Sequence, residues 1–139
     1  MTTETKRPDC TIERDWITGS GLRAVCLVVL REHGRKSHRC GYVAVPKSHA
    51  AFGKEYDDVS VNVHGGLTFG RDNVLGVESS DVWWLGFDCA HSGDALIEES
   101  PYRPEYSHRS RDVVRTQEYV ERECESLAAQ LSNMEKANV

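Results

Sequence analysis

The feature that most constrains the fold is an apolar stripe near the C-terminus. Apolar residues recur at spacings of seven, four, three and four in the series Val113, Val120, Cys124, Leu127, Leu131. This spacing places them on one face of an α-helix, with charged residues on the other faces. A helix with one apolar face must bury that face against another element. Expected N-caps are Ser110 or Asp112, and Asn133 or Asn138 lies near the expected end.

The rest of the chain has the pattern of β-strands. Strands are predicted over residues 11–17, 22–30, 38–45, 59–63, 67–69 and 81–87. The strands over 22–30 and 38–45 are joined by a short polar loop that contains a glycine, which predicts an antiparallel hairpin. Residues 59–63 alternate apolar and polar side chains, as in a half-buried strand. The sequence therefore predicts an α+β fold, with an antiparallel sheet of about five to six strands and a long C-terminal helix packed on one face.

Length and composition indicate one domain. The chain has 139 residues, of which 39% are hydrophobic and 28% charged, as in ordinary globular domains. We expect a disordered tail over residues 1–9 and a single α+β domain over residues 10–139. The longest apolar run, residues 24–30, is far shorter than the roughly 20 residues of a membrane span. Residues 1–9 carry no apolar signal segment, so we expect a cytoplasmic protein without membrane contact.

Charge and cysteine content exclude further classes. The net charge of -5 argues against non-specific nucleic-acid binding, which needs a basic surface. Five scattered cysteines without a C-x-x-C pair favour reduced thiols in a cytoplasm over a disulfide framework. Two of them, Cys26 and Cys124, lie in apolar patterns and are expected to be small core residues. Whether strand edges pair to form a homo-oligomer stays open.

Two segments combine glycines with ionisable side chains at predicted strand ends. His64 precedes Gly65 and Gly66, and paired glycines allow a tight turn and a close approach to a ligand. The second segment carries Asp88, Cys89, His91 and Asp94 directly after the strand over 81–87. If the two strands are neighbours, these polar side chains meet in one pocket.

Several chemistries fit such a pocket. The set His64, Asp88, His91 and Asp94 has ligand types that suit Zn²⁺ or Mn²⁺, and a bound metal ion would supply a nucleophilic water. Without a metal ion, a His–Asp pair could act as a general base; the predicted catalytic residues are His64, Asp88 and His91. A Cys89 thiolate is a third option. The alternative is a turn network whose carboxylates accept backbone N–H groups.

Other side chains are candidates for ligand binding. Cations could steer an anionic group, and aromatic rings could stack on a ring of the ligand. Trp83 and Trp84 point to opposite faces of their strand, so one of them could look outward. The predicted ligand-binding residues are Lys47, His49, Tyr56, Gly65, Gly66, Thr68, Arg71, Trp84 and Cys89.

Longer motifs indicate a family resemblance. They are Cys40-Gly41-Tyr42-Val43, Pro46-Lys47-Ser48-His49, Asp57-Asp58, Val63-His64-Gly65-Gly66-Leu67-Thr68-Phe69 and Trp83-Trp84-Leu85-Gly86-Phe87-Asp88-Cys89-Ala90-His91-Ser92-Gly93-Asp94. Over roughly residues 40–94 the chain resembles a family of small, mostly uncharacterised bacteriophage and bacterial proteins. The resemblance implies work inside a bacterial host cell, on host metabolism or defence, and brings no established activity.

Three functional hypotheses follow from the sequence. The first is a small hydrolase that acts on a phosphorylated or nucleotide-like small molecule, with or without a divalent metal ion (Zn²⁺ or Mn²⁺) as cofactor. The second is a binding protein without chemistry, which sequesters a nucleotide signal or blocks a host defence protein. The third is a structural interaction protein whose polar segments are only turn networks. For the hydrolase and for the sequestering protein, the expected partner is a small anionic molecule such as a nucleotide.

Overall fold

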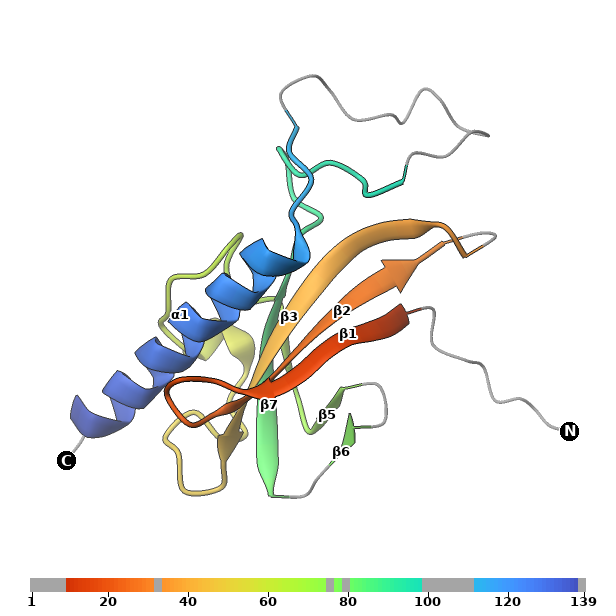
Figure 1. Cartoon of the computed structure of the whole chain (residues 1–139). Coiled ribbons are helices and arrows are strands. Elements are labelled where there is room, and N and C mark those ends of the chain that lie inside the picture. Colours follow the sequence, from red (N-terminus) through yellow and green to blue (C-terminus); the bar gives the residue numbers. More distant parts are fainter. Residues whose placement is uncertain (1–9, 32–33, 75–76, 79–80, 99–111, 138–139) are drawn as a thin grey trace, which may run out of the picture.

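A computed structural model describes residues 10–31, 34–74, 77–78, 81–98 and 112–137 (Figure 1). Its centre is an antiparallel five-stranded sheet of order β1-β2-β3-β7-β4. These strands are β1 (Cys10–Ile17), β2 (Arg23–Leu30), β3 (Lys36–Pro46), β7 (Val82–Asp88) and β4 (Phe69–Arg71). A separate two-stranded sheet pairs β5 (Asn73–Val74) with β6 (Val77–Glu78), and α1 (Gln117–Ala137) is the long C-terminal helix. The predicted α+β architecture is confirmed. The predicted tail over residues 1–9 lies outside the described residues.

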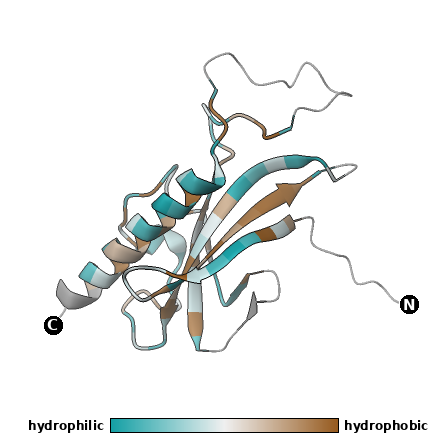
Figure 2. Cartoon of the chain, in the orientation of Figure 1, coloured by the Kyte–Doolittle hydropathy of each residue, from teal (hydrophilic) through white to brown (hydrophobic). Residues whose placement is uncertain are grey.

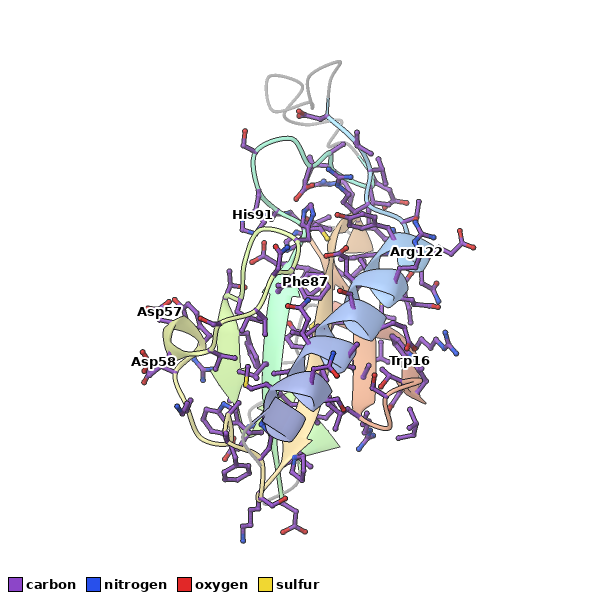
Figure 3. The ribbon with its side chains drawn as sticks, turned by 90° about the vertical axis from the view of Figure 1, so that its left-hand side faces the viewer. Trp16, Asp57, Asp58, Phe87, His91 and Arg122 are labelled. Carbon is purple, nitrogen blue, oxygen red and sulfur yellow. The ribbon has the colours of Figure 1, made fainter. Side chains whose placement is uncertain are left out.

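The sheet carries a core on each face. On the first face, α1 packs over β2, β3 and β7, and Figure 3 shows Phe87 of β7 beside the helix. This core includes Cys26, Val43, Leu85, Phe87, Val120, Cys124, Leu127 and Leu131. The second face is covered in part by Val74 of β5, which packs with Val25, Leu27, Cys40, Ala44 and Trp84. Because β2 is buried on both faces, it is hydrophobic along most of its length, as Figure 2 shows.

A glycine in β3 sets how closely the helix approaches the sheet. A Cβ atom at Gly41 would lie 2.6 Å from Cζ of Phe87 and 2.8 Å from Sγ of Cys124. Any larger residue would push the helix away from β3. The two cysteines predicted as core residues, Cys26 and Cys124, are fully buried here.

The hairpin prediction is confirmed, and one strand prediction is wrong. Strands β2 and β3 pair antiparallel over most of their length. Residues 59–63 form no strand, although Val59 and Val63 are buried against the helix. Instead of a neighbouring strand, the Gln130 side chain of α1 accepts from the Asn62 N–H at 2.7 Å and donates to the Asn62 carbonyl at 2.7 Å. The Gln130 side chain therefore takes the two backbone hydrogen bonds that a neighbouring strand would make with Asn62. The short strand predicted over 67–69 is found two residues later, as β4.

The predicted start of the helix is also wrong. The helix begins at Gln117, and the Thr116 hydroxyl accepts the N–H of Tyr119 at 3.1 Å, so Thr116 caps it. Val113 lies before the helix, where it forms a parallel bridge with Asp94 and is 49% exposed. Its place in the apolar periodicity is therefore coincidental. Asp112 precedes the helix, Asn133 lies inside it, and Ser110 and Asn138 fall outside the described residues.

Candidate functional site

The His64 ring is held on both sides by hydrogen bonds. Its Nε2 lies 2.9 Å from Oδ2 and 3.1 Å from Oδ1 of Asp94. Its Nδ1 lies 2.7 Å from the hydroxyl of Tyr119, and the two rings meet edge to face with centroids 5.4 Å apart. The backbone N–H of His64 donates to Oε1 of Glu123 at 2.8 Å. Two residues of α1 thus fix the turn that carries this imidazole.

Asp94 is a buried carboxylate with three donors. Its side chain is 1% exposed. Besides His64, it accepts from Nε of Arg115 at 2.8 Å and from the backbone N–H of His91 at 3.0 Å. Burial alone would raise the pKa of Asp94, but the hydrogen bonds from Arg115, His64 and the His91 backbone outweigh it and hold the pKa below its usual value. Asp94 is therefore ionised at neutral pH.

A second, more exposed pair lies beside this network. Nε2 of His91 is 3.1 Å from Oδ1 of Asp88, and the two side chains are 34% and 29% exposed. The contact lacks hydrogen-bond geometry, and the buried Nε2 has no hydrogen-bond partner. Asp88 instead accepts from the N–H of Ala90 at 3.0 Å and from the Thr68 hydroxyl at 3.2 Å. Asp88 therefore connects the end of β7 to Thr68, the residue that precedes β4.

Gly65 lets the second pair lie against the first. Its φ is +68°, a left-handed conformation that favours glycine. A Cβ atom at Gly65 would lie 2.3 Å from both Cδ2 and Nε2 of His91. The ring of His91 therefore occupies the space next to the Gly65 backbone, near the upper end of the sheet in Figure 3.

The four residues predicted to share one pocket lie at the same end of the sheet but form two pairs. The rings of His64 and His91 are 6.0 Å apart between centroids. Both nitrogens of His64 already have protein partners. Among the described residues, no three His, Cys, Asp or Glu side chains are placed to hold a metal ion. The predicted zinc or manganese site stays a prediction, without a matching cluster in this part of the chain.

A groove of about 630 Å³ lies on the sheet face opposite α1. This volume falls within the range of roughly 300–1,000 Å³ that small-molecule sites occupy. The lining comes from five strands and from the loop around the 3-10 turn η2 (Tyr56–Asp58). The lining residues are Cys10, Leu27, Tyr42, Glu55, Tyr56, Thr68, Phe69, Gly70, Arg71, Asn73 and Val74.

Two aromatic rings of the groove lining pack against each other. Tyr42 and Phe69 lie on either side of Gly86 in the strand register, and their rings meet edge to face with centroids 4.9 Å apart. A Cβ atom at Gly86 would lie 2.3 Å from the Tyr42 ring, so glycine is required for the Tyr42 ring to lie against β7. The lining therefore offers an apolar aromatic surface.

Arg71 adds a positive charge to this surface. Its guanidinium carbon lies 6.0 Å from the centre of the Phe69 ring, at the outer limit of a cation–π contact. Within the part of the chain that the structure describes, Arg71 forms no ion pair and no hydrogen bond through its side chain. The charge of this exposed guanidinium is thus available to a ligand.

The predicted ligand-binding residues divide between the groove and other places. Tyr56, Thr68 and Arg71 line the groove. Lys47 is exposed at the end of β3, and Gly65 and Gly66 form the turn after His64.

Three of the predicted ligand-binding residues are inaccessible. Trp84 is fully buried, so the prediction that it stacks on a ligand does not fit this structure. His49 is buried and bonded to the Leu131 carbonyl and the Ala51 N–H. Cys89 is also buried, and burial raises the pKa of its thiol to about 12, which argues against a thiolate nucleophile.

The sequence did not predict four residues that belong to the His64 network or to the groove lining. Arg115 and Tyr119 complete the His64 network, and Tyr42 and Phe69 form the aromatic part of the groove lining. One signal was available for Tyr119. It lies in the N-terminal half of the predicted helix, which a two-layer fold places on the sheet.

Comparison with protein-family models, curated proteins and solved structures finds no match to this chain. The resemblance to bacteriophage proteins therefore stays a prediction. Within the described residues, no helix combines the length and apolarity that crossing a bilayer requires.

Proposed function

We propose that the protein binds a small molecule that joins a flat ring to an anionic group, such as a nucleotide, in the groove opposite α1. The observation that carries this proposal is the unpaired cation of Arg71 beside an aromatic lining. Surface cations commonly pair with a nearby carboxylate, as Arg23 does with Asp15 on the same face of the sheet. Arg71 has no such partner among the described residues, although Glu55 lines the same groove.

The chemistry of the lining suits both halves of such a molecule. The rings of Phe69 and Tyr56 can stack on a flat ring, which is worth about 1–3 kcal/mol per base. Arg71 can donate two parallel hydrogen bonds to a phosphate or carboxylate. Burial raises the pKa of Tyr42, so its hydroxyl stays a neutral group at physiological pH. Glu55 and Asn73 supply an acceptor and an amide for the polar edge of a ring.

Binding is favoured over hydrolysis in the groove by the location of the predicted catalytic residues. His64, Asp88 and His91 lie at one end of the sheet, and none of the three lines the groove. Thr68 is the lining residue that also contacts the Asp88–His91 pair. The proposal therefore follows the hypothesis of a nucleotide-sequestering protein, and the hydrolase hypothesis stays a prediction.

The test is isothermal titration calorimetry with AMP, adenosine and inorganic phosphate. AMP contains both recognised groups, whereas the other two probes contain one each. The variants are Arg71→Gln and, as a matched control, Arg122→Gln, since Arg122 is an exposed cation of α1 (Figure 3). A hydrogen bond to a charged group contributes about 1.5–3 kcal/mol, so Arg71→Gln should weaken AMP binding by roughly 10- to 100-fold.

The expected pattern is tightest binding for AMP, with the preference for AMP over adenosine lost in Arg71→Gln and retained in Arg122→Gln. The proposal is wrong if none of the probes binds, or if the two variants bind AMP equally well.

A further inference from the structure

The hydrogen bonds around His64 fix where its proton lies. Ionised Asp94 can only accept, so the Nε2 atom of His64 that faces it carries a proton. Arg115 also pairs with Asp94, through a 2.8 Å ion pair. In a neutral imidazole with Nε2 protonated, Nδ1 is an acceptor. The Tyr119 hydroxyl, 2.7 Å away, therefore donates its proton to His64.

This order of groups is the one that activates hydroxyl nucleophiles. A carboxylate fixes the tautomer of an imidazole, and the imidazole accepts the proton of a hydroxyl group as that group attacks. Here the three groups are Asp94, His64 and Tyr119. Burial and nearby Glu123 raise the pKa of Tyr119, so the phenol is protonated at neutral pH and needs a base to react.

We propose that Tyr119 is a nucleophile that accepts acyl groups from activated esters, with His64 and Asp94 as its general base. Tyr119 is only partly buried, whereas Asp94 behind it is closed off. The Arg115 guanidinium lies 4.9 Å from the centre of the Tyr119 ring and can stabilise negative charge that develops during attack. The site is independent of the groove, because none of these four residues lines it.

The step conserves atoms and electrons. The phenolic oxygen of Tyr119 attacks the ester carbonyl carbon and forms a new C–O bond, while its proton moves to Nδ1 of His64. The bond between the carbonyl carbon and the oxygen of the activated leaving group, p-nitrophenolate in the test below, then breaks. His64 returns the proton to the leaving group, which leaves an O-acyl tyrosine and the free hydroxyl compound, here p-nitrophenol.

The test is acylation by p-nitrophenyl acetate, followed by release of p-nitrophenol and by peptide mass spectrometry to locate the acetyl group. Tyr56 is the control within the same molecule, since it is 37% exposed and has no histidine contact among the described residues. General-base catalysis is typically worth about 10²- to 10⁴-fold. We therefore expect Tyr119 to be acetylated at least about tenfold faster than Tyr56, and His64→Gln to remove this advantage. Tyr119→Phe should remove the acetylated peptide.

A second measurement separates activation from folding. Wild-type protein is acetylated in buffer and in concentrated urea, and the rate at Tyr119 is compared. A partly buried tyrosine without activation reacts more slowly in the folded protein, whereas an activated one reacts faster there. The proposal is refuted if Tyr119 reacts no faster than Tyr56, if unfolding does not slow its reaction, or if folded His64→Gln reacts at the wild-type rate.

Discussion

Replacing Gly65 by alanine tests how the two polar pairs are packed together. Gly65 and Gly66 have φ values of +68° and +83°, so alanine at either position costs about 1–2 kcal/mol for the left-handed conformation. The positions differ in their surroundings. A Cβ atom at Gly66 would have no neighbour within 4 Å, whereas at Gly65 it would lie 2.3 Å from the His91 ring. Ordinary carbon contacts lie at about 3.5–4.0 Å, so the ring must move by more than an ångström.

Overpacking of this kind costs about 1–3 kcal/mol, and the partly exposed ring of His91 can swing outward to limit it. We therefore expect Gly66→Ala to lower the free energy of unfolding by about 1–2 kcal/mol and Gly65→Ala by about 2–4 kcal/mol. The assay is urea unfolding followed by tryptophan fluorescence. Adding His91→Ala to Gly65→Ala should remove the excess cost in a double-mutant cycle. Equal losses for the two glycine variants, or no coupling to His91, would refute the reasoning.

Three further predictions concern the core, the buried carboxylate and the thiols. Gly41→Ala should lower the free energy of unfolding, measured in urea, by about 1–3 kcal/mol, because its Cβ atom collides with Phe87 and Cys124. The control is Gly19→Ala, whose Cβ atom would meet only Glu125, at 3.4 Å. Gly19→Ala should lower the free energy of unfolding clearly less. Because the folded-state pKa of Asp94 is lowered, its stabilising contribution is present above the unfolded value near 3.9 and is lost as pH falls through the folded pKa. The free energy of unfolding of Asp94→Asn should therefore be about 1.5–3 kcal/mol lower than that of the wild type at pH 7. Below pH 4 it should fall less steeply with pH than that of the wild type. An equally steep fall would contradict this. Iodoacetamide should alkylate the partly exposed Cys10 well before Cys40 and Cys89, because burial raises the pKa of those two thiols to about 12. Peptide mass spectrometry measures the rate of labelling at each cysteine. Labelling of Cys89 as fast as that of Cys10 would disprove the prediction.

Local periodicity predicted the layers of the fold but not the partners of each segment. The stripe from Val120 to Leu131 is buried as predicted, because helix periodicity depends on neighbouring residues alone. The alternation over residues 59–63 failed as a strand signal, because Gln130 of α1 takes the backbone partners of Asn62. A contact between residues 68 positions apart leaves no local trace in the sequence.

Contacts between distant residues also explain why the sequence predicted the candidate sites only in part. His64 and Asp94 were predicted to meet if the strands over 59–63 and 81–87 were neighbours. The two side chains are in contact, although residues 59–63 form no strand. Their partner Tyr119 lies 55 residues from His64. The groove depends on the register that sets Tyr42 and Phe69 around Gly86, and the short strand β4 has too few residues for its pattern to specify that register.

Nuclear magnetic resonance of ¹⁵N-labelled protein during a titration with AMP tests the binding proposal most directly, because it locates the ligand. Binding in the groove should shift the backbone amide signals of Phe69, Gly70 and Arg71 in β4 and of Tyr42 in β3, all of which line it. The amides of His64 and Gly66, at the other site, should stay unchanged. Shifts confined to the His64 turn, or no shifts at millimolar AMP, would contradict the account.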